Sequence, residues 1–490
     1  MPVLNPVALR RLGIALLYAA LFGGRLTLDR IPGWPSALFG PAVRELATAC
    51  CLFIVYLLNR RERIEFSGSA FKLVVAIIGL HAFLLIRGLI SSQPTSNSQL
   101  TFDLAMLSVQ LAVVLALFRS REDCVWLAWV MVAGAAVFAC LAIAGFGSPE
   151  KYGHGWSPLG SPITFQRVEI TGFFAALYLF WRENKAGAQA FLLGLATLSL
   201  FASLASLLKA GVIAAVAGVG LLVLRDYANG AYRSALVAAT VAVLSFFLFF
   251  SLRGSLISAR TTEAFDQGGL VSADALARVA DRVAEEVNRL AAGLDAKSAA
   301  ALRKRCDLGK VTDTLQSGLL VLPQSEEEYL CAKIVSNALY PNIPRSEELF
   351  VFADRTHRAR LVARAWLDFT ASPWWGNGLG TYRFVATTSY DPEPKVYTYP
   401  HNIILEFLAG IGIIGTLVFI AVIGYAIHLL ERARVFVSPE RFWYAGAATV
   451  FVSAQFAGDY FDFRLVWFFA LLALTMPTVQ AQARLSPSVA

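Results

Sequence analysis

The sequence predicts an all-α polytopic membrane protein with about twelve transmembrane helices and one large, helical outer domain. Two observations support this prediction. Hydrophobic residues make up 57% of the 490 residues and charged residues only 16%, and the mean hydropathy is +0.60, values typical of polytopic membrane proteins. The apolar residues also gather into runs of the length that crosses a bilayer as a helix, roughly 20 residues.

The expected spans fall into two blocks that are separated by one long polar segment. This pattern predicts three regions: helices in 1–253, a loop domain in 254–400, and further helices in 401–490. The individual spans are expected near 9–24, 43–59, 70–91, 101–118, 124–146, 165–182, 188–206, 208–225, 234–253, 401–430, 442–458 and 464–480.

Basic residues mark the sidedness of these spans. Alternate connections contain most of them: Arg60, Arg61 and Arg63; Arg119 and Arg121; Arg182 and Lys185; Arg225 and Arg233; Arg432, Arg434 and Arg441; and Arg484. Loops rich in Lys and Arg face the cytoplasm, so these connections and both termini are expected there. The segment 254–400 is then outside. The net charge of +8 is explained by topology, and nucleic acid is not an expected partner.

The outer segment has the composition of a small domain. Its stretch SADALARVADRVAEEVNRLAAGL places apolar residues at spacings of three and four, which predicts an amphipathic helix. Cys306 and Cys331 are the two cysteines of this domain. An oxidising compartment permits a disulfide between them, and the sequence leaves that pairing open.

Polar residues concentrate near the outer ends of the expected spans. The middle of the bilayer is sparse by comparison: His81 and Gln110 stand out, either as hydrogen-bonding partners of a neighbouring helix or as functional groups. Those expected at the outer rim are Arg167, Glu169, Lys209, His401, Asn402, Glu406, Asp459, Asp462 and Arg464. Cations at the outer ends of apolar helices suit a ligand that has an anionic head group and a lipid tail, such as a lipid-linked diphosphate.

Two stretches resemble a known family. PHNIILEFLAGIGIIG, from Pro400, resembles the His-Asn, Leu-Glu, Gly-x-x-Gly signature of the bacterial O-antigen ligase and O-antigen polymerase superfamily. RARLVARAWLDFTASPWWGNGLGTYRF, from Arg358, resembles the element that precedes this signature in that family. GDYFDFRLVW is similar to a segment of some polymerase-like members.

The resemblance implies a GT-C-like membrane glycosyltransferase that takes glycans from undecaprenyl diphosphate at the periplasmic face of the bacterial inner membrane. The reaction is expected to be inverting and metal-independent, and no cofactor is expected. His401 matches the family's essential histidine and Arg358 its loop arginine. Lys209, in SLLKAGV, stands where members often have an arginine. Lysine keeps the charge of that arginine but lacks its bidentate fork.

The expected chemistry follows from these residue types. Negative charge develops on the departing diphosphate, so Arg358 and Lys209 are expected to stabilise the transition state. The acceptor hydroxyl loses a proton, and the His401 imidazole suits that task. Supporting substrate contacts are expected from Arg167, Arg360, Asn402, Glu406 and Arg464. No cluster with metal-ligand spacing is present in the sequence.

Five functions stay open, of which a protein-glycosylating relative of this family is the most distant glycosyltransferase. A polymerase of O-antigen or exopolysaccharide repeat units is favoured by the large outer domain and by GDYFDFR. A ligase that transfers the glycan to lipid A-core is the first alternative. A transporter or flippase of lipid-linked sugars predicts charges buried at the midplane and movement without bond formation. A structural subunit of an export complex predicts that His401→Ala has no effect.

Overall fold

The computed structural model describes residues 5–23, 40–61, 68–90, 97–144, 162–206 and 209–266, parts of 284–305 and 365–370, then 371–378 and 402–485 apart from 458–459 and 461–462. Within these residues every regular element is a helix. Contacts divide the chain into two units. Unit 1 comprises Met1–Leu252, Ser372–Thr381 and His401–Ala490, and unit 2 comprises Arg253–Ala371 and Tyr382–Pro400.

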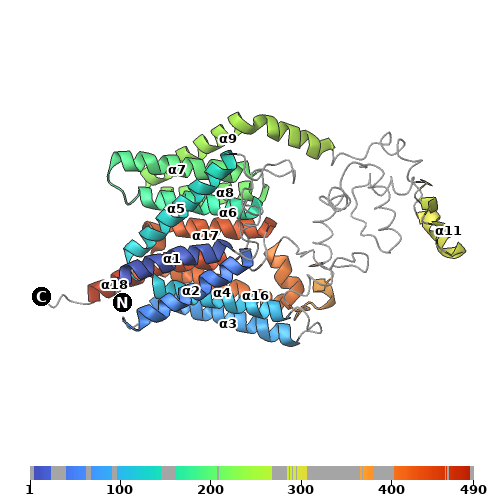
Figure 1. Ribbon diagram of the computed structural model, residues 1–490, viewed down its shortest axis with the longest axis horizontal. Helices are drawn as coiled ribbons and strands as arrows, with labels where there is room; N and C mark the ends of the chain where they lie inside the picture. The colour runs from blue at the N-terminus through green and yellow to red at the C-terminus, as the bar shows by residue number, and fades with distance from the viewer. Residues whose placement is uncertain are drawn as a thin grey trace. The chain divides into compact units, whose positions relative to one another are not determined.

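A helix covers each of the twelve predicted spans (Figure 1). The helices of the first block are α1 (Pro6–Gly23), α2 (Gly40–Asn59), α3 (Gly68–Ile90), α4 (Asn97–Leu117), α5 (Arg121–Ile143), α6 (Pro162–Phe180), α7 (Ala186–Ala205), α8 (Lys209–Ala228) and α9 (Tyr232–Asp266). The later ones are α16 (Ile403–Arg432), α17 (Arg441–Ala457) and α18 (Arg464–Leu485), with a short 3₁₀ helix at Val435–Val437. In unit 2, α11 covers Ala296–Arg305.

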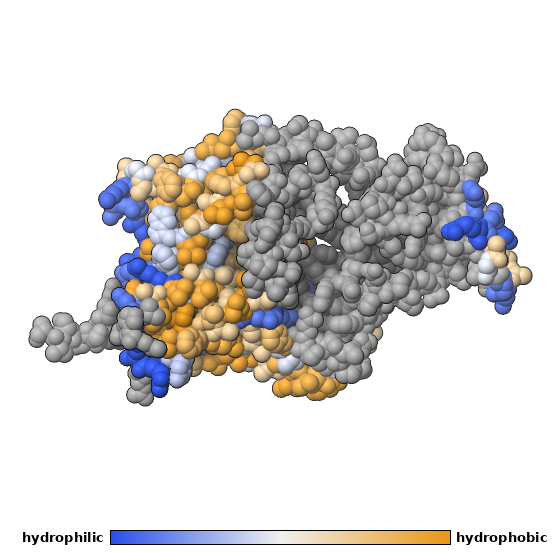
Figure 2. Space-filling view, in the orientation of Figure 1, coloured by the Kyte–Doolittle hydropathy of each residue, from blue (hydrophilic) through white to orange (hydrophobic). Residues whose placement is uncertain are grey.

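Seven of the described helices are long and apolar enough to cross a membrane: α2, α3, α5, α7, α8, α9 and α16. Shorter apolar stretches lie at Thr101–Leu117 and Arg464–Thr475. Large apolar side chains are exposed on the spanning helices, including Leu224, Leu236 and Phe247, each at least 66% exposed. Figure 2 shows an apolar surface over these helices. The chain is therefore a multi-pass helical membrane protein.

Two boundaries differ from the sequence prediction. The helix expected to end at 253 continues as α9 to Asp266, because helix formation does not require apolar residues and this extension contains no proline. Ser372–Thr381, which the sequence analysis assigned to the loop domain, belongs to unit 1, because its backbone bonds to α16. The calls on Cys306 and Cys331 lie outside the described residues.

Aromatic side chains fill the core between α16, α17 and α18. Phe407 and Phe419 on α16 stack with ring centroids 4.1 Å apart. Phe463 contacts Phe419 and Trp467, at centroid distances of 5.2 Å and 5.1 Å. All of these rings are almost fully buried. This core fixes the start of α18 against the first half of α16, where the candidate site lies.

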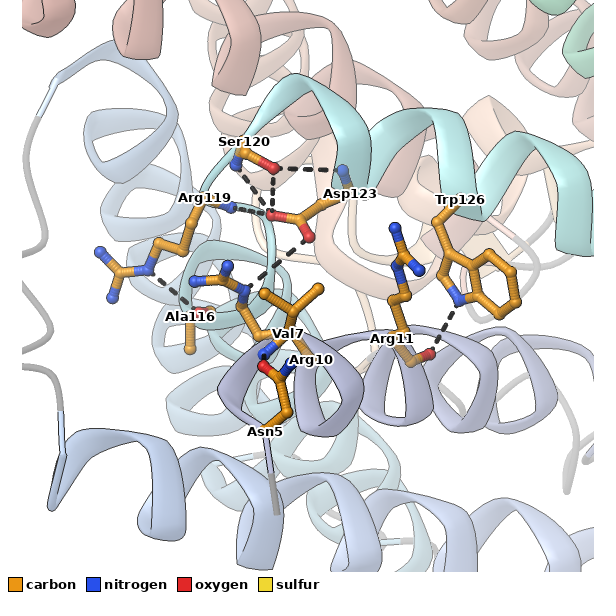
Figure 3. A network of polar contacts seen from close by, with 9 residues as sticks. All are labelled: Asn5, Val7, Arg10, Arg11, Ala116, Arg119, Ser120, Asp123 and Trp126. Atoms are coloured by element: carbon orange, nitrogen blue, oxygen red, sulfur yellow. Dashed lines mark hydrogen bonds and ion pairs between the residues drawn. The ribbon is translucent and has the colours of Figure 1, made fainter. Parts of the chain in front are cut away.

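The beginning of α1 and the end of α18 lie at the same end of the helix bundle (Figure 1). Polar side chains at this end join the first residues of α1 to the start of α5 (Figure 3). Asp123 accepts hydrogen bonds from the backbone N–H groups of Arg119 and Ser120, at 3.0 Å and 2.8 Å. Arg10 Nε lies 3.8 Å from the same carboxylate. Trp126 Nε1 donates to the Arg11 carbonyl oxygen at 2.9 Å.

This arrangement predicts a stability effect at Asp123. The side chain is 3% exposed and completes a capping box with Ser120. We expect Asp123→Ala to lower the free energy of unfolding by about 2 kcal/mol, because a cap is lost and buried donors are left without an acceptor. Thermal unfolding in detergent measures this. The matched control is Glu122→Ala at the exposed neighbouring position, and equal effects of the two variants would contradict the prediction.

Candidate functional site

The start of α16 is fixed by Asn402. Its side-chain oxygen accepts a hydrogen bond from Leu405 N at 3.0 Å, which caps the helix. Its amide nitrogen donates to the Gln455 carbonyl oxygen of α17 at 3.2 Å. Asparagine is a favoured cap because its side chain satisfies a backbone donor that has no partner in the helix. Asn402 therefore sets where α16 begins, directly after Pro400 and His401 in the sequence.

Glu406 joins α16 to the segment before α18. The residue is 4% exposed, and its Oε2 accepts a hydrogen bond from Tyr460 N at 3.1 Å. A buried carboxylate is stabilised by such donors, and removing them leaves an uncompensated group. Asn402 and Glu406 thus both hold the first turn of α16 to neighbouring segments. Their predicted contact with substrate stays a prediction.

His81 of α3 extends this network. The Ser108 hydroxyl donates to the Leu104 carbonyl oxygen at 2.9 Å, so it accepts from His81 Nδ1, which lies 2.6 Å away. His81 Nε2 then accepts from the Tyr460 hydroxyl at 2.8 Å. Both ring nitrogens are used and the ring is 2% exposed. A neutral imidazole with its proton on Nδ1 satisfies every group.

His81 and Gln110 thus both bond to neighbouring helices, which is one of the two roles that the sequence allowed. Gln110 Nε2 donates to Thr48 Oγ1 at 3.1 Å.

The glycines of the GIG stretch interrupt α16. Gly412 has φ 66° and ψ −168°, which is not helical. This conformation is essentially confined to glycine. A Cβ atom at Gly412 would also overlap the backbone of Trp374 and Trp375. The helix is therefore discontinuous about three turns from its start.

The segment 372–378 provides hydrogen-bond partners for backbone groups of α16 that the interruption at Gly412 leaves without partners inside the helix. Ile413 N donates to the Pro373 carbonyl oxygen at 2.8 Å and Ile414 N to that of Trp374 at 3.3 Å. In the other direction, Asn377 N donates to the Ala409 carbonyl oxygen at 3.1 Å, and Gly378 N to that of Gly410. Backbone groups inside a membrane require such partners. The two stretches that carry the family resemblance therefore contact each other through their backbones.

Gly376 and Arg87 complete this contact. Gly376 has φ 64°, and a Cβ atom there would overlap the backbone of Gly410 and Ile411. Arg87, at the end of α3, donates to the carbonyl oxygens of Trp375 and Gly376 at 2.8 Å and 3.2 Å. Its guanidinium carbon also lies 5.4 Å from the Trp375 ring centroid. Sequence analysis did not select Arg87, although a basic residue at a span end that is expected to be outer departs from the charge rule.

The remaining predicted residues are dispersed over several helices. Arg464 is 9% exposed, and its Nε and Nη2 donate to the Leu21 carbonyl oxygen in the last turn of α1, at 3.0 Å and 2.6 Å. Arg167 lies on α6 and is 4% exposed. Lys209 is the first residue of α8, but its side chain is outside the described part of the structure. His401, Arg358 and Arg360 are also outside it.

The described residues include no group of three His, Cys, Asp or Glu side chains that could hold a metal ion. No protein-family model matches the sequence, and no curated protein matches it significantly.

The His81–Tyr460 hydrogen bond gives a testable prediction. We expect Tyr460→Phe to lower the free energy of unfolding by about 1–3 kcal/mol, because it leaves a buried imidazole nitrogen without its donor. Tyr178→Phe is the matched control, since the Tyr178 hydroxyl is buried without a hydrogen-bond partner. Thermal unfolding of the two purified variants makes the comparison. A loss for Tyr178→Phe as large as that for Tyr460→Phe would contradict the network.

Proposed function

We propose that the protein is an inverting, metal-independent glycosyltransferase that uses an undecaprenyl-diphosphate-linked glycan. It acts at the periplasmic face of a bacterial inner membrane, with twelve spans, a GT-C-like fold and both termini in the cytoplasm. The observation that most supports this proposal is the backbone contact between 372–378 and the interrupted helix α16. It joins the two stretches that resemble the O-antigen ligase and polymerase superfamily, and does so in the first half of the helix that follows His401.

Each step of the proposed reaction is assigned to particular residues. His401 accepts the proton of the acceptor hydroxyl while the new C–O bond forms at the anomeric carbon. The bond to undecaprenyl diphosphate breaks, and Arg358 and Lys209 stabilise the charge on the leaving oxygen. Arg167, Arg360 and Arg464 are supporting contacts to the donor. Asn402 and Glu406 hold the first turn of α16, whose N-terminal end favours negative charge.

Two acceptors fit this chemistry. A polymerase passes the growing glycan to another repeat unit, and a ligase passes it to lipid A-core. We favour the polymerase because of the large outer domain and the segment GDYFDFR, in which Tyr460 anchors α16 and His81.

The glycan profile of cells that lack the protein distinguishes the two. If only single repeat units remain on the lipid acceptor, or if polymer disappears while attachment persists, the protein is a polymerase. If long chains accumulate on undecaprenyl diphosphate while lipid A-core stays bare, it is a ligase. An unchanged glycan profile would contradict both.

A transporter of lipid-linked sugars is the second candidate, favoured by two observations. Interrupted helices form substrate and ion sites in many transporters, and α16 is interrupted at Gly412. A buried acidic residue, Glu169, lies on α6. This candidate predicts movement of the donor across the bilayer with no glycosidic bond formed. Release of undecaprenyl diphosphate by the purified protein excludes it as the whole function.

A further inference from the structure

Glu169 differs from the other buried acidic residues of the described structure. Those residues each have a polar partner: Asp123 bonds to backbone N–H groups, Asp226 pairs with Arg441 at 2.7 Å, Glu440 pairs with Arg182 at 2.9 Å, and Glu406 accepts from Tyr460 N. Glu169 is 0% exposed. Neither carboxylate oxygen has a backbone or cationic partner among the described residues, and the side chain that interacts with it is the Ser199 hydroxyl of α7. Its charge is therefore uncompensated by the side chains around it.

Glu169 lies within helix α6, beyond its first turn. It lies seven residues after Pro162, the first residue of α6, which corresponds to about 10 Å along the helix. α6 packs against α5, α7, α8 and α17. Arg167, two residues earlier, cannot face it across the same helix, because residues two apart point in different directions. An isolated carboxylate in such surroundings is strongly disfavoured.

Oxygen atoms of neighbouring helices surround this position. Ser199 Oγ of α7 lies 3.3 Å from where a Cβ atom of Gly172 would be, one turn from Glu169 on α6. Tyr18 of α1 and Cys140 of α5 lie close enough to interact electrostatically with Glu169. α7 contains no charged residue. On α6 itself the basic residue is Arg167, two positions from Glu169, and hydroxyl oxygens are suitable ligands for a small cation.

Further polar atoms without partners connect Glu169 to the beginning of α6. Gln166 Nε2, one turn earlier on α6, has no hydrogen-bond partner, and neither does Ser203 Oγ, one turn after Ser199 on α7. α6 and α7 are joined by a short loop and run antiparallel, so both groups lie toward the same end of the helix pair. The Tyr18 hydroxyl is likewise buried without a partner. The polar groups of Gln166, Ser203 and Tyr18 provide a path along which a cation reaches the carboxylate.

We propose that Glu169 is a monovalent-cation site within the membrane domain, at which Na⁺ or a proton neutralises the carboxylate and the Ser199, Ser203 and Tyr18 hydroxyls complete its surroundings. The site lies on helices other than α16, and it does not depend on the proposed glycosyl transfer. A water molecule alone satisfies hydrogen bonds but leaves the negative charge in place, so it does not fulfil this role.

Labelling by dicyclohexylcarbodiimide tests the proposal in the purified full-length protein. This apolar reagent reacts with protonated carboxyl groups within the membrane, and peptide mass spectrometry locates the adduct. In Na⁺-free buffer we expect an adduct on Glu169 that falls about tenfold per pH unit once the carboxyl group begins to lose its proton. The Glu406 peptide is an internal control, because that carboxylate has a backbone donor. Glu169→Gln removes the signal, and mapping of the wild-type peptide identifies the site even if this variant folds poorly.

Addition of Na⁺ at constant pH separates the two occupants. If Na⁺ suppresses the Glu169 adduct and choline does not, the site binds Na⁺. If the adduct depends on pH alone, the occupant is a proton. An adduct that is absent at every pH without Na⁺, or that is insensitive to both pH and Na⁺, would overturn the proposal. The readout needs no glycan substrate, so its failure is distinct from failure of the proposed function.

Discussion

Gly412→Ala is expected to lower the free energy of unfolding by about 4 kcal/mol and to abolish glycan transfer. The backbone at Gly412 has φ 66° and ψ −168°, and a side chain in that region costs about 1–3 kcal/mol. The added Cβ atom would also overlap the Trp374 carbonyl group, and such overpacking costs a similar amount. Relief of this overlap would push 372–378 away from α16 and leave the Ile413 and Ile414 N–H groups without acceptors.

Gly424→Ala is the matched control on the same helix. No atom lies within 4 Å of the Cβ position at Gly424, so alanine there is expected to be neutral or to stabilise α16 by up to about 1 kcal/mol. Thermal unfolding in detergent, together with the glycan profile in cells, compares the two variants. If Gly412→Ala unfolds at the same temperature as Gly424→Ala, the interruption of α16 is not required for the fold.

His401→Ala is expected to reduce glycan transfer by about a hundred- to ten-thousand-fold, the usual contribution of a general acid or base. The histidine directly precedes the Asn402 cap in the sequence, and the cap bonds through its own side chain to Leu405 N and the Gln455 carbonyl oxygen. Because neither bond requires His401, the variant is expected to retain its abundance and unfolding temperature. The measurement is the glycan profile beside the amount of protein in the membrane.

His428→Ala provides the control for a histidine on α16. His428 is exposed near the other end of the helix, and its removal is expected to leave transfer unchanged. Full polymer in cells that contain His401→Ala at normal abundance would contradict the assignment of His401 as the base. That result would favour the transporter or a structural subunit.

The sequence located the helices well because apolar length alone determines where a helix can cross a bilayer. α3 was expected at 70–91 and lies at Gly68–Ile90, and α7 was expected at 188–206 and lies at Ala186–Ala205. The extension of α9 to Asp266 was missed because hydropathy identifies where an apolar segment ends. It does not identify where the helical backbone ends.

The interruption of α16 was missed for a different reason. Glycines spaced like Gly410, Gly412 and Gly415 often mediate close helix packing in membranes. The structure places a backbone segment against them, and that contact joins residues more than 30 positions apart. Glycine spacing is the same for both roles, so only the tertiary structure separates them.

Charge patterns were similarly ambiguous at Glu169 and Arg464. Both were placed at the outer rim from their distance to a span's end. The structure adds that Arg464 donates to the Leu21 carbonyl oxygen of α1 and that Glu169 is fully enclosed. A sequence gives the position of a charge along a helix, but its partners depend on how the helices pack.

Incubation of the purified protein with an undecaprenyl-diphosphate-linked repeat unit in lipid nanodiscs tests the central claim most directly. The account predicts release of undecaprenyl diphosphate by the wild type, in step with lengthening of the glycan or its transfer to added lipid A-core. His401→Ala is predicted to lack both products and His428→Ala to form them. If wild-type protein that binds the lipid-linked unit releases no undecaprenyl diphosphate with either acceptor present, the protein is not the proposed glycosyltransferase.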